Sequence, residues 1–106
     1  VMYRVIWSDF AVGQLEQIFQ FFTEKADDHI ARSIVLELLS TSEKLIEHPE
    51  LGPREITLIH LGTTYRCLVQ GNYKIIYSVD EQSKVIRISD VFDVRQSPKK
   101  LFREKD

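Results

Sequence analysis

The chain has 106 residues, of which 43% are hydrophobic, and its formal net charge is −2 at pH 7. This length fits one domain with an apolar core, residues 1–106, and leaves no room for a second domain. The slightly acidic balance argues against a general polyanion binder, which is usually basic overall. The charge is uneven, however, because acidic residues gather in the first half and a basic tail, Lys99 to Arg103, follows the second.

A short strand and two helices are predicted in the first half. Residues 3–7 are aromatic and β-branched, as in a strand. Ser8 or Asp9 then caps a helix whose apolar residues recur every three or four positions until the pattern fails near residues 25–26. Asp27 or Asp28 caps a second helix, which ends before Pro49 because the residue before a proline disfavours helical geometry. Two helices joined this closely form an antiparallel hairpin, and we expect their apolar stripes to pack on a sheet.

Three strand-like runs joined by short polar turns make up the second half. Gly71-Asn72 is a two-residue hairpin signal. Turns this short require antiparallel neighbours, and the runs span residues 65–70, 73–79 and 85–92. Residues 56–61 alternate weakly and are expected to form a strand or an extended loop. The order predicts an α+β fold, β-α-α-β-β-β, with an antiparallel sheet of about four strands, an N-terminal strand and a helical hairpin on one face.

Cysteine usage and the absence of apolar runs bear on the compartment. Cys67 is the only cysteine, and no apolar run approaches the roughly 18 residues of a membrane span. The opening residues also lack the pattern of a signal peptide, so we expect a cytoplasmic protein without a membrane partner. Cys67 lies among apolar neighbours and is expected to be a buried, inert thiol. No cysteine pair, spaced histidine pair or glycine-rich phosphate loop is present, so no metal and no cofactor are predicted.

Basic side chains lie inside the predicted strands, where apolar ones are usual. They are Arg66, Lys74 and Arg87, and Arg95 follows the last run. A cation held on a sheet is destabilising unless it is paired or faces solvent, so an anionic partner deserves consideration. The alternative is structural pairing, in which Asp90 and Asp93 neutralise Arg66 or Arg95.

The order and spacing of several segments together resemble the RelE/ParE superfamily of bacterial type II toxin–antitoxin toxins. The resemblance spans nearly the whole chain and includes SDFAVGQLEQIFQFF, the HPELG that ends the second helix, YRCLVQGNYKIIYSV and VIRISDVFDVRQSPKKL. It implies a small cytoplasmic toxin held inactive by a cognate antitoxin. RelE-like members of the superfamily cut mRNA in the ribosomal A site, whereas ParE-like members inhibit DNA gyrase. The implied target is therefore either gyrase or the ribosome with its mRNA.

A ribonuclease of the RelE type would use Arg66, Lys74 and Arg95 as its catalytic cations, as the resemblance implies. RNA cleavage needs such cations to stabilise the charged phosphorane, and it also needs groups that move protons. Lys74 stands where these ribonucleases usually carry Arg, and Leu68 stands where a second sheet Lys is expected. Lysine keeps the charge but lacks the bidentate fork that matches phosphate. No Tyr or His follows Arg95 in RQSPKKLF, so the terminal acid–base group is missing.

The departures from the ribonuclease pattern favour a ParE-like toxin that inhibits gyrase by binding it and is not a catalyst. The first alternative is a RelE-like, ribosome-dependent mRNA endonuclease. The second is a degenerate, non-toxic interaction or co-repressor module. The resemblance further implies an antitoxin segment that folds on binding, in a toxin–antitoxin hetero-oligomer, and a homodimer is also considered. Candidates for contact with the antitoxin or the target are Phe21, Val35, Leu39, Arg87, Lys99 and Lys100. Core burial is the competing explanation for the three apolar ones.

Overall fold

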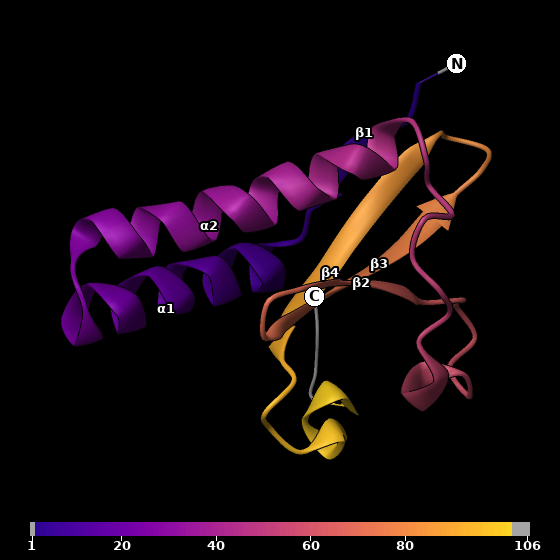
Figure 1. Cartoon of the computed structure of the whole chain (residues 1–106). Helices are drawn as coiled ribbons and strands as arrows, with labels where there is room; N and C mark the ends of the chain where they lie inside the picture. The colour runs from indigo at the N-terminus through magenta and orange to yellow at the C-terminus, as the bar shows by residue number, and fades with distance from the viewer. Residues whose placement is uncertain (1, 103–106) are drawn as a thin grey trace.

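The predicted α+β fold is confirmed by a computed structural model, which describes residues 2–102 without the side chains of Pro98 and Phe102 (Figure 1). Arg103, in the predicted basic tail, lies outside the described residues. The elements in chain order are β1 (Arg4–Trp7), α1 (Asp9–Lys25), α2 (Asp28–Glu43), η1 (Lys44–Ile46), η2 (Ile56–Leu58), β2 (Arg66–Gln70), β3 (Tyr73–Asp80), β4 (Val85–Asp93) and η3 (Pro98–Phe102), where η denotes a short 3₁₀ helix.

Side-chain caps begin both α-helices at the predicted positions. The Ser8 hydroxyl accepts a hydrogen bond from the Ala11 amide at 3.1 Å, and the Asp27 carboxylate accepts one from the Ile30 amide at 2.8 Å. Such caps satisfy amides that have no partner within the helix. Figure 1 shows α1 and α2 side by side as the predicted hairpin. Within the described residues, neither helix combines the length and the apolarity needed to traverse a bilayer.

The sheet has the order β1-β4-β3-β2. β2, β3 and β4 form the predicted antiparallel meander, and Gly71, with a φ of 60°, sits in the β2–β3 turn. β1 pairs with β4 in parallel, however, so the sheet is mixed, and the expectation that it is antiparallel throughout is corrected at this edge. The physical reason is that β1 is joined to the meander through the helical hairpin, a connection long enough to return the chain in the same direction.

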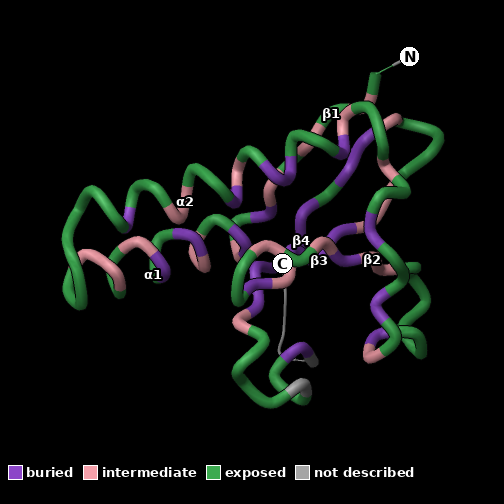
Figure 2. The backbone as a smooth tube through the Cα atoms, viewed as in Figure 1, coloured by how far each residue is buried: buried purple, intermediate pink, exposed green. Residues whose placement is uncertain are grey.

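Both faces of the sheet carry a hydrophobic core. Figure 2 shows the buried residues in purple along the central strands β3 and β4. The first core lies between the hairpin and the sheet and is formed by Ala11, Leu15, Ile18, Leu38, Leu45, Tyr73, Ile75, Tyr77, Ile86, Ile88 and Val91. The second core is formed by Leu58, Cys67, Ile76, Phe92 and Leu101. Ile75 and Ile76 are neighbours on β3 and belong to different cores, because successive strand residues point to opposite faces. Residues from η2 and η3 therefore cover part of the sheet face that the helices leave open.

Residues 56–61 are neither a strand nor an extended loop, so that expectation was wrong. Residues 56–58 form η2, and the Glu55 carboxylate accepts a hydrogen bond from the Thr57 amide at 3.2 Å in its first turn. Leu58 is 1% exposed and belongs to the second core, whereas Ile56 and Ile59 are exposed. The alternation is weak because Leu58 alone of these six residues is deeply buried. The 3₁₀ turn places its side chain against the sheet, in the second core.

Candidate functional site

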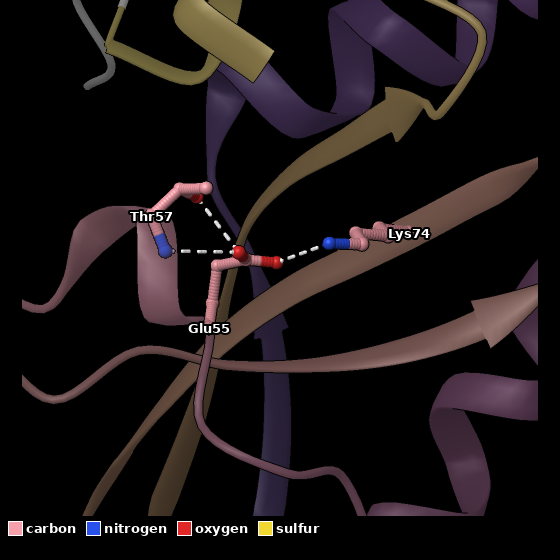
Figure 3. A network of polar contacts seen from close by, with 3 residues as sticks. All are labelled: Glu55, Thr57 and Lys74. Atoms are coloured by element: carbon pink, nitrogen blue, oxygen red, sulfur yellow. Dashed lines mark hydrogen bonds and ion pairs between the residues drawn. The ribbon is translucent and has the colours of Figure 1, made fainter.

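Lys74 is held in an ion pair with a carboxylate that is almost fully buried (Figure 3). Its Nζ lies 2.8 Å from Glu55 Oε1, and the Glu55 side chain is 3% exposed. The other carboxylate oxygen accepts hydrogen bonds from the Thr57 amide and hydroxyl. Burial alone would raise the pKa of Glu55, but the hydrogen bonds from Lys74 and Thr57 outweigh burial and hold the pKa below its ordinary value. This network joins η2 to β3.

Arg66 is committed to a different contact, with the loop that precedes η2. Its Nη1 donates to the Gly52 carbonyl oxygen at 2.8 Å. The Gly52 amide in turn donates to the Tyr77 hydroxyl at 2.9 Å, and that hydroxyl donates to the Pro49 carbonyl at 2.8 Å. The predicted pairing of Arg66 with an aspartate is therefore replaced by a bond to the backbone. Arg66 and Tyr77 together fix residues 49–52 against the sheet.

Arg95 forms the predicted pair with Asp93, two residues earlier in the chain. The guanidinium is bidentate, with Nε donating to Oδ1 at 2.9 Å and Nη2 to Oδ2 at 2.7 Å. Hydrogen bonds from Arg95 hold the pKa of Asp93 below its ordinary value. Both residues line a pocket of about 270 Å³ together with Phe21 and Tyr73. Burial raises the pKa of Tyr73, so this phenol stays protonated at neutral pH and is a poor base.

The three predicted catalytic cations do not converge. Arg66 lies directly opposite Tyr77 in the ladder, and Lys74 lies opposite Phe92. Tyr77 belongs to the first core and Phe92 to the second, and directly opposed residues share a face. Arg66 and Lys74 are therefore on opposite faces of the sheet. Arg95 lies beyond the end of β4 beside α1, in the pocket that Phe21 lines.

The apolar candidates on the hairpin divide between two sites. Phe21 is 49% exposed, packs edge-on against Phe22 and lines the pocket of Arg95. Val35 and Leu39 are half-buried and pack against the first core. Val35 also lines a largely apolar groove of about 650 Å³ on the hairpin, hereafter the hairpin groove, with Leu15, Glu16, Phe19, Gln20, Thr23 and Glu24. Phe19 was not among the predicted binding residues, although it lies on the apolar side of α1 that forms this groove.

The basic candidates and the cysteine lie on the side of the sheet away from the hairpin. Arg87 is exposed on β4 between two residues of the first core, and Lys99 and Lys100 are exposed on η3. Cys67 is in the second core, and burial raises the pKa of its thiol. This bears out its expected role as a buried, unreactive residue. Arg4 on β1 was not singled out from the sequence, although the alternation of residues 4–7 places it on the same side as Ile6.

Comparisons with known proteins identify a family from the sequence and a similar fold among solved structures. The family model described as the ParE toxin of the type II toxin–antitoxin system parDE matches residues 5–98. Among solved structures, the chain is similar to one in a chromosomal ParDE toxin–antitoxin system from P. aeruginosa, with a TM-score of 0.73 and 17% sequence identity. That match covers 88% of this chain and 97% of the other. A search of curated proteins found no match.

Proposed function

The chain belongs to the ParE toxin family of type II toxin–antitoxin systems, and from this premise we propose that it inhibits DNA gyrase by binding it and does not cut RNA. The ParE family supports gyrase as the target. The placement of the sheet cations supports binding over catalysis, and this single observation carries the proposal.

The argument against RNA cleavage is geometric. Cleavage without a metal needs cations and a proton-transfer group within hydrogen-bond reach, about 3 Å, of one reacting phosphate. Because Arg66 and Lys74 lie on opposite faces of the sheet, one phosphate cannot contact both. Each cation also has a local acceptor that competes with phosphate: the Gly52 carbonyl for Arg66, Glu55 for Lys74 and Asp93 for Arg95.

Membership of a type II system implies an antitoxin partner. We propose that the cognate antitoxin covers the hairpin groove and forms a hetero-oligomer with the toxin. The groove offers apolar side chains from both helices, Phe19 and Val35 among them, as an amphipathic segment requires. Glu16 and Glu24, which are exposed and also line the groove, would attract basic residues in that segment.

The test of this function compares two purified targets. We expect the toxin to stop gyrase from supercoiling relaxed plasmid DNA, and we expect the antitoxin to restore supercoiling when added at equal concentration. In parallel, translating ribosomes with a labelled mRNA should show no cleavage. Normal supercoiling at saturating toxin together with cut mRNA would instead establish the RelE-like endonuclease. Neither effect, with no growth arrest on overexpression, would indicate an interaction or co-repressor module.

A further inference from the structure

Three residues form a row across neighbouring strands on the face of the sheet away from the hairpin. Arg87 on β4 lies directly opposite Ile6 on β1 and directly opposite Ser78 on β3. Ile86 and Ile88, which flank Arg87, belong to the first core, so Arg87 points away from the helices. Arg87 is exposed, Ile6 is 37% exposed and Ser78 is half-buried. The row therefore presents a cation, an apolar side chain and a hydroxyl on rigid strands.

A groove of about 490 Å³ lies along this row. It is lined by the three residues of the row, by Thr63 from the loop after η2, by Asp80 at the end of β3 and by Glu81 in the β3–β4 turn, among others. The row and its groove are hereafter the open-face groove. η2 and η3 contribute Leu58 and Leu101 to the second core, but neither residue lines this groove.

Arg87 and Arg4 differ from the other sheet cations in how they are paired. Within residues 2–102, neither guanidinium makes a hydrogen bond or an ion pair, whereas Arg66, Lys74 and Arg95 each make one. Arg4 lies two residues before Ile6 on β1 and shares its face, so it is a diagonal neighbour of Arg87, within the reach of long side chains. Arg4 thus adds a second cation next to the residues that line the groove.

The carboxylates beside the groove are already in use. Asp80 accepts hydrogen bonds from the backbone amides of Gln82 and Ser83 at 3.0 and 3.2 Å. Hydrogen bonds from Ser83 and Gln82, and to a smaller extent the charge of Arg87, hold the pKa of Asp80 below its ordinary value. Glu81 accepts a hydrogen bond from the Tyr3 hydroxyl at 2.6 Å and pairs with Lys84 at 3.7 Å. Both carboxylates thus have partners, and Arg87, which forms neither a hydrogen bond nor an ion pair within the described residues, remains available to a carboxylate from outside.

We propose that the open-face groove is where the toxin contacts its protein target, and that it binds an acidic segment in which a carboxylate stands beside an apolar side chain. Arginine pairs with carboxylates in a bidentate manner, and Ile6 offers the adjoining apolar contact. A protein fits better than a nucleic acid, because the whole chain has a formal net charge of −2 and a phosphate backbone would not use the apolar contact that Ile6 offers beside Arg87. This inference rests on the proposed function, which assigns the hairpin groove on the other side of the sheet to the antitoxin.

The experiment compares Arg4→Glu/Arg87→Glu with the wild type and with Arg32→Glu, which reverses an exposed charge on α2. We expect the double variant to need at least about tenfold more protein to inhibit gyrase supercoiling, as for loss of an interfacial charge pair. Arg32→Glu should inhibit like the wild type, and added salt should weaken the wild type more than the double variant. Unchanged antitoxin binding and an unchanged melting temperature would show that the double variant is folded. If it unfolds, Arg87→Gln is the test, and its inhibition should weaken in the same direction.

Three results would overturn the inference. One is wild-type potency in the double variant or in folded Arg87→Gln. Another is loss of antitoxin binding with gyrase inhibition intact, which would assign the groove to the antitoxin. The third is binding of a DNA duplex or an RNA hairpin that depends on Arg4 and Arg87. If the wild-type toxin itself leaves gyrase unaffected, the proposed function fails. Growth arrest on induction then tests the groove independently, because a double variant that arrests growth like the wild type contradicts it whatever the target is.

Discussion

At the residue scale, the ion pair with Glu55 explains why a lysine, Lys74, is tolerated on β3. A cation on a half-covered sheet loses hydration, and a carboxylate that is 3% exposed loses more. Their contact, with two further hydrogen bonds from Thr57, satisfies both charges. Removing one partner of such a pair costs more than the pair itself contributes, because the remaining charge stays buried and unsatisfied.

Lys74→Ala should therefore destabilise the protein at neutral pH by about 1–3 kcal/mol, below the value for a fully buried pair because Lys74 is 30% exposed. The pKa of Glu55 is depressed in the folded state, so its stabilising contribution is present above the ordinary value of 4.5 and is lost as the pH falls through the folded pKa. In the variant, Glu55 loses the hydrogen bond and the charge of Lys74, both of which lower its pKa, so its pKa is higher than in the wild type. The difference in unfolding free energy between variant and wild type should therefore shrink toward about pH 3.

Urea unfolding at neutral and acidic pH measures this difference directly. Lys84→Ala is the matched control, because its partner Glu81 is exposed and such surface pairs contribute about 0–1 kcal/mol. A cost for Lys74→Ala that is the same at both pH values would contradict the assignment of a buried, ionised Glu55.

At the scale of elements, two glycines have opposite roles. Gly52 lies in the loop fixed by Arg66 and Tyr77, and a Cβ added there would collide with the Cys67 carbonyl oxygen. Gly13 lies within α1, where an added Cβ would meet nothing within 4 Å. We expect Gly52→Ala to lower the unfolding free energy by about 2–4 kcal/mol because backbone must move. Gly13→Ala should raise it by about 0.5–1 kcal/mol, since alanine favours the helix. Chemical denaturation of both variants checks the signs, and a neutral Gly52→Ala would contradict the close approach of loop and strand.

The sequence predicts elements well where the signal is local. Ser8 and Asp27 begin the two helices because a cap acts within its own turn, and Gly71-Asn72 determines the β2–β3 turn in the same way. The parallel pairing of β1 is not predictable locally, because its partner strand begins at Val85, about 80 positions later. The fold class therefore follows from the sequence, while the position and direction of the edge strand depend on how the hairpin packs.

In the candidate site, too, contacts between residues close in the sequence are predictable, whereas contacts between distant residues are not. That Lys74 and Arg95 require partners follows from the cost of a cation on a sheet, and Asp93 was identified because it is two residues from Arg95. Glu55 was not identified, because it lies in a segment with weak periodicity and meets Lys74 only through the packing of η2. Whether Arg66 and Lys74 share a face depends on the register between strands, which no single strand encodes.

At the scale of the whole molecule, the sheet separates the hairpin groove from the open-face groove. The hairpin and its groove lie on one face, and the second core covers part of the other. Under the proposals above, the antitoxin and the target meet opposite sides of one sheet. The extent to which the open face is exposed then depends on the packing of η2 and η3 against the sheet, because a short 3₁₀ helix has few hydrogen bonds of its own.

The docking of η3 gives a prediction about the whole fold. Leu101 of η3 is 1% exposed and belongs to the second core, where it joins Leu58 of η2 and Phe92 of β4. Leu101→Ala should lower the unfolding free energy by about 2–4 kcal/mol, as for a leucine removed from a packed core. Lys99→Ala, an exposed change two residues earlier, should stay within about 0.5 kcal/mol of wild type.

Urea unfolding followed by the fluorescence of Trp7, which packs against the first core, reports whether the loss of stability in Leu101→Ala extends to the other face of the sheet. A destabilised Leu101→Ala with an unchanged Trp7 transition would mean that the two cores unfold separately, and an unaffected stability would mean that η3 is not part of the folded unit.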